Sequence, residues 1–186
     1  MKASKTVKYG LQALFIVLVA AVLHYNLTRT QVAQIVGTDV KRLDSTARGK
    51  SADNLQGKGL KVRDVRFINA QSKSGKVEVF RNEDTGWGWP PYMKFNSADI
   101  AAEAQTFATA EGNPWVLLKY YGWRIHIFDM YPNIVSLKQV PRDYKHIPWF
   151  NFVFLLVLAG GSLFVIRRSR QLVNKIKARF KRDKTE

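Results

Sequence analysis

Residues 147–166 read IPWFNFVFLLVLAGGSLFVI, and this stretch decides the class of fold. None of its 20 positions is charged, and Asn151 and Ser162 are its strongly polar side chains. A bilayer core about 30 Å thick is crossed by about 20 helical residues, whereas a core helix of a soluble protein does not need so long an apolar run. The stretch therefore predicts a transmembrane helix, with Pro148 in its first turn and Trp149 at the interface.

A second apolar stretch lies near the other end of the chain. Residues 11–27 (LQALFIVLVAAVLHYNL) carry no charge, and the preceding Tyr9 and Gly10 extend the predicted span to residues 9–27. The lysines within residues 1–8 also suit the basic region of a cleavable signal peptide, which is the alternative. Because residues 19–21 (VAA) fit a cleavage site only weakly, we expect a retained helix.

Positive charge is concentrated in the two tails. The chain has 30 Lys and Arg against 14 Asp and Glu, a net charge of +16, of which residues 1–8 carry +3 and residues 167–186 carry +7. Basic residues next to spans mark the cytoplasmic side. We therefore expect a bacterial inner-membrane protein with a basic cytoplasmic N-terminus (residues 1–8), a cytoplasmic C-terminus and residues 28–146 in the periplasm.

Residues 167–186 predict a basic amphipathic cytoplasmic tail. Leu172, Ile176 and Phe180 recur at helical spacing on one side of this segment. Such a helix suits an anionic leaflet, where each basic residue contributes about 1 kcal/mol. A protein partner is the alternative, and a nucleic acid is disfavoured because nothing here resembles a base-reading motif. The predicted contacts with anionic lipid are Arg167, Arg168, Arg170, Lys175, Lys177 and Arg179.

The segment between the spans predicts a β-rich domain with one helix. Alternating or apolar runs predict strands at residues 30–43, 60–70, 76–80, 115–121, 123–128 and 134–140. A helix is expected before Gly112, capped by Asn96 or Ser97, and residues 45–59 predict a loop. The order of three strands, a helix and further strands resembles the OB fold, a small closed barrel, while a generic α+β sandwich is the alternative.

Two aromatic clusters are the candidate binding sites. Residues 86–92 read GWGWPPY, and residues 120–124 read YYGWR. Aromatic side chains on a loop shaped by glycine and proline could stack on a sugar, clamp an extended peptide, contact a partner or the membrane, or plug the end of the barrel. The candidate partner- or ligand-binding residues are Trp87, Trp89, Tyr92, Tyr121, Trp123 and Arg124.

No arrangement of residues predicts catalysis. Residues 84–86 (DTG) match the triplet of aspartic proteases, but that chemistry needs two carboxylates that share a proton, and the triplet occurs once. Cysteine is absent, and the three histidines lie far apart without carboxylates at ligand spacing. We therefore expect no bound metal, no cofactor and no enzymatic activity.

Several motifs resemble those of a proteobacterial membrane-protein family known only as a domain of unknown function. The resemblance covers roughly residues 5–140 and leaves the basic tail outside. It implies a bacterial inner-membrane protein, implies no activity and carries over no functional residue. The motifs are His24-Tyr25, residues 35–40 (IVGTDV), residues 84–92 (DTGWGWPPY), residues 121–124 (YGWR) and Pro132-Asn133.

These observations predict a non-enzymatic inner-membrane protein with two transmembrane helices, which presents a periplasmic, barrel-like β domain. We expect a scaffold or accessory subunit for another envelope protein. The alternative is a glycan- or peptide-binding module that uses residues 86–92. The sequence identifies neither the partner nor the oligomeric state.

Overall fold

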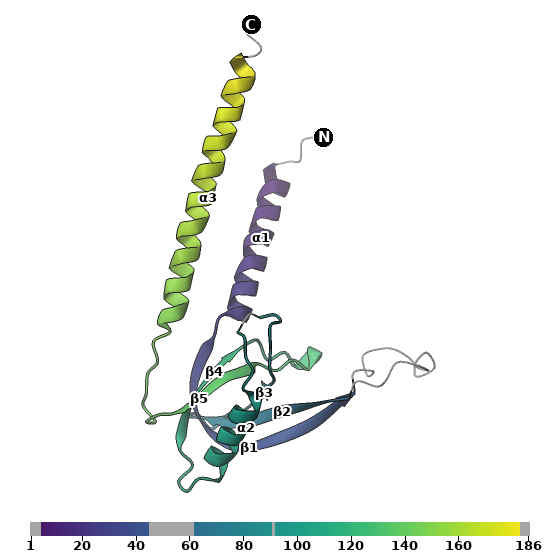
Figure 1. Cartoon of the computed structure of the whole chain (residues 1–186), viewed down its shortest axis with the longest axis vertical. Helices are drawn as coiled ribbons and strands as arrows, with labels where there is room; N and C mark the ends of the chain where they lie inside the picture. The colour runs from purple at the N-terminus through teal and green to yellow at the C-terminus, as the bar shows by residue number, and fades with distance from the viewer. Residues whose placement is uncertain (1–4, 45–61, 91, 183–186) are drawn as a thin grey trace, which may run out of the picture. The chain divides into compact units, whose positions relative to one another are not determined.

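The computed structural model describes residues 5–44, 62–90 and 92–182, and the predicted loop at residues 45–59 lies outside them (Figure 1). The chain divides into two compact units, Met1–His146 and Ile147–Glu186. The described helices are α1 (Lys5–Asn26), α2 (Ser97–Thr109) and α3 (Trp149–Arg182). The described strands are β1 (Arg29–Asp44), β2 (Val62–Ser72), β3 (Val77–Asn82), β4 (Trp115–Tyr121) and β5 (Asn133–Gln139).

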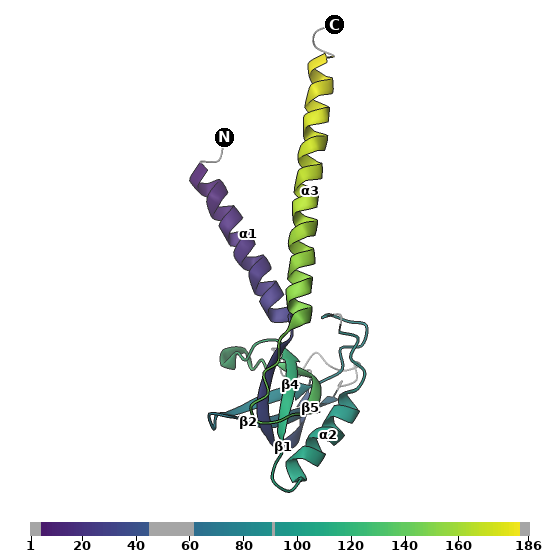
Figure 2. The ribbon, with the colours of Figure 1, turned by 90° about the vertical axis from the view of Figure 1, so that its left-hand side faces the viewer.

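Within the described residues, five strands close into a barrel in the order β1-β2-β3-β5-β4, with β4 pairing back to β1 (Figure 2). The neighbouring strands are antiparallel except β3 and β5, which run parallel and pair at Arg81 and Asn133. β1 pairs with both β2 and β4, and a bulge between Ile35 and Gly37 locally increases its bend and twist. The interruption expected at Gly37 is this bulge within a continuous strand.

Apolar side chains fill the barrel, and their alternation along the strands is the sequence pattern that predicted the β domain. Burying one such side chain stabilises the fold by about 1.5–3 kcal/mol. Helix α2 adds Ile100 and Ala104, which are 2% and 0% exposed. The strand residues of this cluster are Ala33, Ile35, Ile68, Ala70, Phe80, Val116, Leu118, Ile134 and Leu137.

The predicted strand at residues 123–128 is wrong. A short 3-10 turn, η2 (His126–Phe128), stands there, and Ile125 and Met130 form an isolated bridge around it. Ile127 is 91% exposed and Phe128 is 62% exposed, so these apolar residues face away from the core. Apolar side chains on a surface turn gave the same alternating pattern as a half-buried strand.

Two helices contain windows that are long and apolar enough to cross a membrane. These windows are Tyr9–Asn26 in α1 and Trp149–Asn174 in α3, and no part of either is buried within the protein. At 1.5 Å per residue, the 34 residues of α3 extend about 51 Å, well beyond a bilayer core of about 30 Å. Helix α3 is therefore long enough to cross a bilayer core, and it continues without a break from its apolar part into the basic residues.

Candidate functional site

The end of α1 is bonded to the turn that follows β4. The backbone N–H of Gly122 donates to the carbonyl of Tyr25 at 3.0 Å, and Trp123 Nε1 donates to His24 Nδ1 at 2.8 Å. The ring of Tyr25 meets Tyr121 and Trp123 edge-on, with centroids 6.3 and 5.4 Å apart. Gly122 has a φ of +92°, in the left-handed region that favours glycine. Two predicted binding residues, Tyr121 and Trp123, thus hold α1 on the barrel.

A buried lysine fixes the loop between β3 and α2. The structure describes residues 83–90 and 92–96 of this loop, which are called the aromatic loop below. Lys94 is 3% exposed, and its Nζ donates to Asn82 Oδ1 and to the carbonyl of Ile134, both at 2.6 Å. Asn82 Nδ2 donates in turn to the carbonyl of Ser97 at 2.7 Å. These bonds join the loop to β3, β5 and the start of α2.

The electrostatic surroundings of Lys94 are mixed. Burial lowers the pKa of Lys94 to about 8, because the ammonium loses hydration, while the carboxylates of Asp84 and Glu83 act in the opposite direction. Lys94 is therefore mainly a cation at neutral pH. Its two oxygen acceptors supply the hydrogen bonds that a buried ammonium requires.

Asp84 caps α2 from a distance of 13 residues along the chain. Its Oδ1 accepts from the backbone N–H of Ser97 at 2.9 Å, and its Oδ2 accepts from Ser97 Oγ at 2.7 Å. Asn96 occupies the N-cap position, one of the two predicted, but its side chain makes no cap bond, and Asp84 bonds the start of the helix instead. In the triplet that matches aspartic proteases, this carboxylate is engaged by the start of a helix.

Asn133 ties the beginning of the aromatic loop to β5. Its side-chain amide donates to the carbonyl of Glu83 at 3.0 Å and to Tyr121 OH at 2.9 Å, and it accepts from the N–H of Glu83 at 3.0 Å. Tyr92 stacks on Tyr121 with ring centroids 4.7 Å apart. Burial raises the pKa of Tyr92 to about 12, so its hydroxyl is neutral at physiological pH. The loop and α1 therefore share Tyr121 as a common contact.

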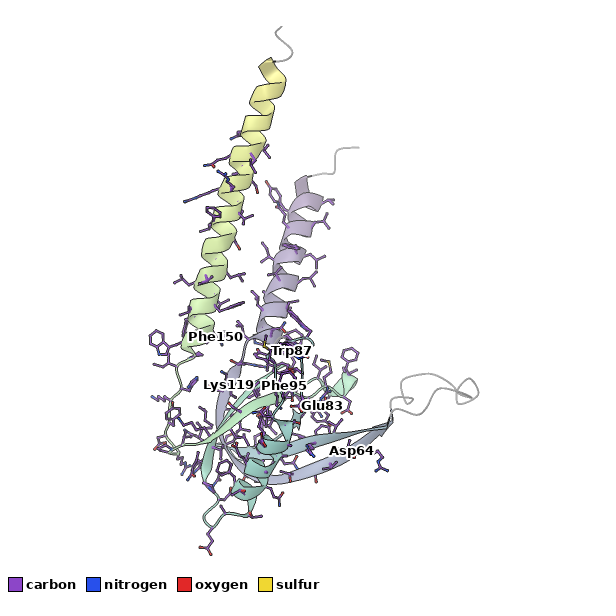
Figure 3. All side chains as sticks on the ribbon, viewed as in Figure 1. Asp64, Glu83, Trp87, Phe95, Lys119 and Phe150 are labelled. Carbon is purple, nitrogen blue, oxygen red and sulfur yellow. The ribbon has the colours of Figure 1, made fainter. Side chains whose placement is uncertain are left out.

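The two tryptophans of the aromatic loop face solvent. Trp87 is 82% exposed and Trp89 is 72% exposed, so they do not plug the barrel. Trp87 meets Phe95 with ring centroids 5.7 Å apart, and Figure 3 shows both at the end of the barrel next to α1. A polar groove of about 410 Å³ lies elsewhere on the barrel. Its lining residues are Thr30, Gln31, Val32, Ser72, Lys73, Ser74, Leu117, Tyr144 and His146.

Arg124 braces the turn around η2. Its guanidinium lies over the ring of Tyr131 at 3.8 Å, donates to the carbonyl of Met130 at 2.9 Å and lies 3.8 Å from the Asp129 carboxylate. Arg124 thus orders the segment that carries Ile127 and Phe128.

The residues predicted to contact anionic lipid lie on α3. Arg167, Arg168 and Arg170 are exposed on this helix. Lys175, Lys177 and Arg179 continue the same helix, and their side chains lie outside the described ones. A straight helix carries Arg179 about 20 Å beyond Ile166 at 1.5 Å per residue.

Sequence reasoning missed Lys94, Asn82 and Asn133. A lysine between Met93 and Phe95 carries no local sign of burial, because its acceptors come from β3 and β5. The two asparagines stand at the end of β3 and the start of β5, where a strand pattern ordinarily changes to polar residues. The sequence marked Asn133 only as part of the Pro132-Asn133 motif, to which no role was assigned.

These features define a class of protein, a small five-stranded barrel that joins a fixed aromatic loop to a helix apolar enough to cross a membrane. Among residues 5–44, 62–90 and 92–182 there is no group of three or more His, Cys, Asp and Glu residues that could hold a metal ion.

The chain belongs to the DUF1523 family, described as a protein of unknown function, whose family model matches residues 5–173. This confirms the expected kind of family and extends the match from about residue 140 into α3. An "Uncharacterized protein" of Haemophilus influenzae is 40% identical over 148 residues, which cover 77% of this chain and 79% of that protein. No solved structure matches the chain.

Proposed function

We propose that this chain is a two-span inner-membrane protein that holds an OB-like barrel on the periplasmic side as an accessory subunit of another envelope membrane protein. The two exposed apolar windows support the spans, and the basic residues beside them support the orientation. The strand order and the position of α2 between β3 and β4 support an OB fold.

The observation that carries the accessory role is the contrast between the inside and the outside of the aromatic loop. On the inner side, Lys94, Asp84 and Asn133 bond the ends of the loop to the barrel. On the outer side, Trp87 is 82% exposed and Trp89 is 72% exposed. Tryptophan is enriched among the residues that dominate protein interfaces, and fixing it beforehand lowers the entropy lost on binding. Such a fixed geometry suits a partner with a defined surface.

A glycan- or peptide-binding role for residues 86–92 has weaker support. An exposed indole can stack on a sugar, but small-ligand sites are concave and bury most of the ligand. The groove of about 410 Å³ is lined by other residues, and none of them belongs to the aromatic loop. We therefore favour a protein partner.

For the basic part of α3, we propose that Arg167, Arg168 and Arg170 contact anionic headgroups, because they directly follow the apolar span. Lys175, Lys177 and Arg179 reach the same layer if the helix tilts or bends, and otherwise extend toward the cytoplasm.

The test is co-purification of the tagged full chain at native expression in mild detergent, with mass spectrometry. A stoichiometric membrane partner is expected. The Trp87→Ala/Trp89→Ala variant should lose at least about 2 kcal/mol of binding, roughly a 30-fold loss of affinity. Val40→Ala/Val77→Ala, at two exposed apolar positions on β1 and β3, should retain the partner. A solitary protein, or equal recovery of the partner with both variants, would contradict the proposal.

A further inference from the structure

The turn between β4 and β5 carries a second exposed apolar feature at its tip. Ile127 is 91% exposed and Phe128 is 62% exposed, and they are consecutive residues of η2. Two neighbouring large apolar side chains at such exposure are unfavourable in water and would gain free energy from an apolar phase that covers them. We call this pair the η2 tip.

The η2 tip is held in place on its own side of the barrel. Ile125 and Met130 bond to each other's backbone at 3.0 and 3.2 Å and close the turn at its base. Arg124 spans the same turn through Tyr131 and the carbonyl of Met130. The exposed pair is therefore presented outward by a closed turn.

The η2 tip also lies close to the end of the first apolar helix. Trp123, four residues before Ile127, donates to His24 in the last turn of α1. β1 begins three residues after α1 ends, a stretch that covers at most about 11 Å of extended chain. Figures 1 and 2 both show η2 at the end of the barrel from which α1 leaves. If α1 crosses a bilayer, this end of the barrel lies beside the membrane surface.

We propose that Ile127 and Phe128 insert into the leaflet next to the end of α1 and seat the barrel on the membrane surface. This inference rests on the proposal that α1 spans the bilayer. Lipid is the occupant that the chemistry favours, because an aliphatic and an aromatic side chain need only an apolar phase. The aromatic loop differs in that buried polar groups fix its geometry. Insertion places such side chains about 5–10 Å into the boundary between headgroups and acyl chains.

The test uses the absence of cysteine from the natural chain. Full-length Ile127→Cys, labelled with the polarity-sensitive fluorophore NBD, is reconstituted into nanodiscs of phosphatidylethanolamine and phosphatidylglycerol. A second set of discs contains phosphatidylcholines that carry nitroxide spin labels, some near the top and some near the middle of their acyl chains. NBD at position 127 should emit at shorter wavelength and lose intensity in the spin-labelled discs, since a probe about 5–10 Å into the boundary lies within reach of the upper labels.

Two further single-cysteine variants separate the possible results. Phe15→Cys, on an exposed position of α1, should be quenched if α1 spans the bilayer, and Val40→Cys, 64% exposed on β1, should not be quenched. Quenching at 15 without quenching at 127 overturns the seating and leaves the span intact. No quenching at 15 overturns the span and, with it, the seating. A blue shift at 127 without quenching assigns the η2 tip to contact with another protein copy and also overturns the seating.

Discussion

At the scale of single residues, the polar side chains of the barrel end hold a loop in place. Lys94 joins Asn82 of β3 to the backbone of Ile134 in β5, while Asp84 caps α2. Leaving such groups unpaired inside the fold would cost about 1–3 kcal/mol each, so they favour one conformation of the loop. The exposed tryptophans depend on this internal network for their position.

The buried amine of Lys94 should make stability depend on pH. Folding lowers its pKa from 10.5 to about 8, so between these values the unfolded chain keeps a proton that the folded chain releases. The free energy of unfolding should therefore rise between pH 8 and pH 10, by up to about 1.4 kcal/mol per pH unit. Below pH 8 both states are protonated, and the full cost of the buried charge is present. Urea denaturation of the full chain in detergent, followed by near-ultraviolet circular dichroism, measures this slope.

Two lysine variants assign that slope. Lys94→Met removes the titrating group and should flatten the rise, whereas Lys138→Met, at an exposed position of β5, should keep it. Tyr92 has the opposite sign: its pKa is raised to about 12, so stability from this residue is lost only as the pH rises above about 10. An equal slope in both variants would show that Lys94 is not the group responsible.

At the scale of elements, α1 and the barrel are joined by a small set of contacts. Two consecutive residues of the turn donate hydrogen bonds to α1. The Gly122 N–H donates to the Tyr25 carbonyl, and Trp123 Nε1 donates to His24 Nδ1. Aromatic contacts of Tyr25 with Tyr121 and Trp123 enclose them. Through this joint, α1 contacts Tyr121, on which Tyr92 of the aromatic loop stacks, and Trp123, which precedes η2 in the same turn.

Removing one hydrogen bond should loosen this joint. Trp123→Phe keeps an aromatic ring but deletes the indole N–H, at an expected cost of about 1 kcal/mol. Hydrogen exchange at the Gly122 amide should then become about fivefold faster in the full chain, because its bond to Tyr25 depends on the same joint. Trp115→Phe, at the start of β4, is the control and should leave that amide unchanged. Unaltered exchange in Trp123→Phe would refute the role of this bond.

The sequence predicted those elements whose own pattern of apolar and polar residues indicates which side is buried. β1, β3 and β4 alternate or concentrate apolar residues, and β4 is also bounded by Pro114 and Gly122, so their positions follow from local pattern. Residues 123–128 failed because Ile127 and Phe128 are apolar and exposed, which pattern alone cannot distinguish from a strand. The burial of Lys94 and the capping by Asp84 arise from contacts between segments far apart in sequence. Trp87 and Trp89 were identified as candidate binding residues because the composition of their loop is unusual.

At the scale of the whole molecule, the chain combines a barrel with a closed core and two helices whose apolar windows have no buried residue, although Tyr25 at the end of α1 contacts the barrel. A fully exposed apolar helix is unfavourable in water, and a bilayer would remove this cost. We propose the sides from the charge distribution, because the strongly basic segments lie at the two termini and the barrel lies between the two apolar helices in the sequence. The accessory role and the seating of the barrel both depend on this arrangement.

The most direct test of the arrangement is the accessibility of a single cysteine in whole cells. Ser74 is exposed in the turn between β2 and β3, and Ser169 is exposed on α3 just beyond the apolar span. In cells with a permeabilised outer membrane and an intact inner membrane, an impermeant maleimide should label Ser74→Cys. Ser169→Cys should be labelled only after the inner membrane is opened. Protection of Ser74→Cys until that membrane is opened would place the barrel in the cytoplasm and contradict the account.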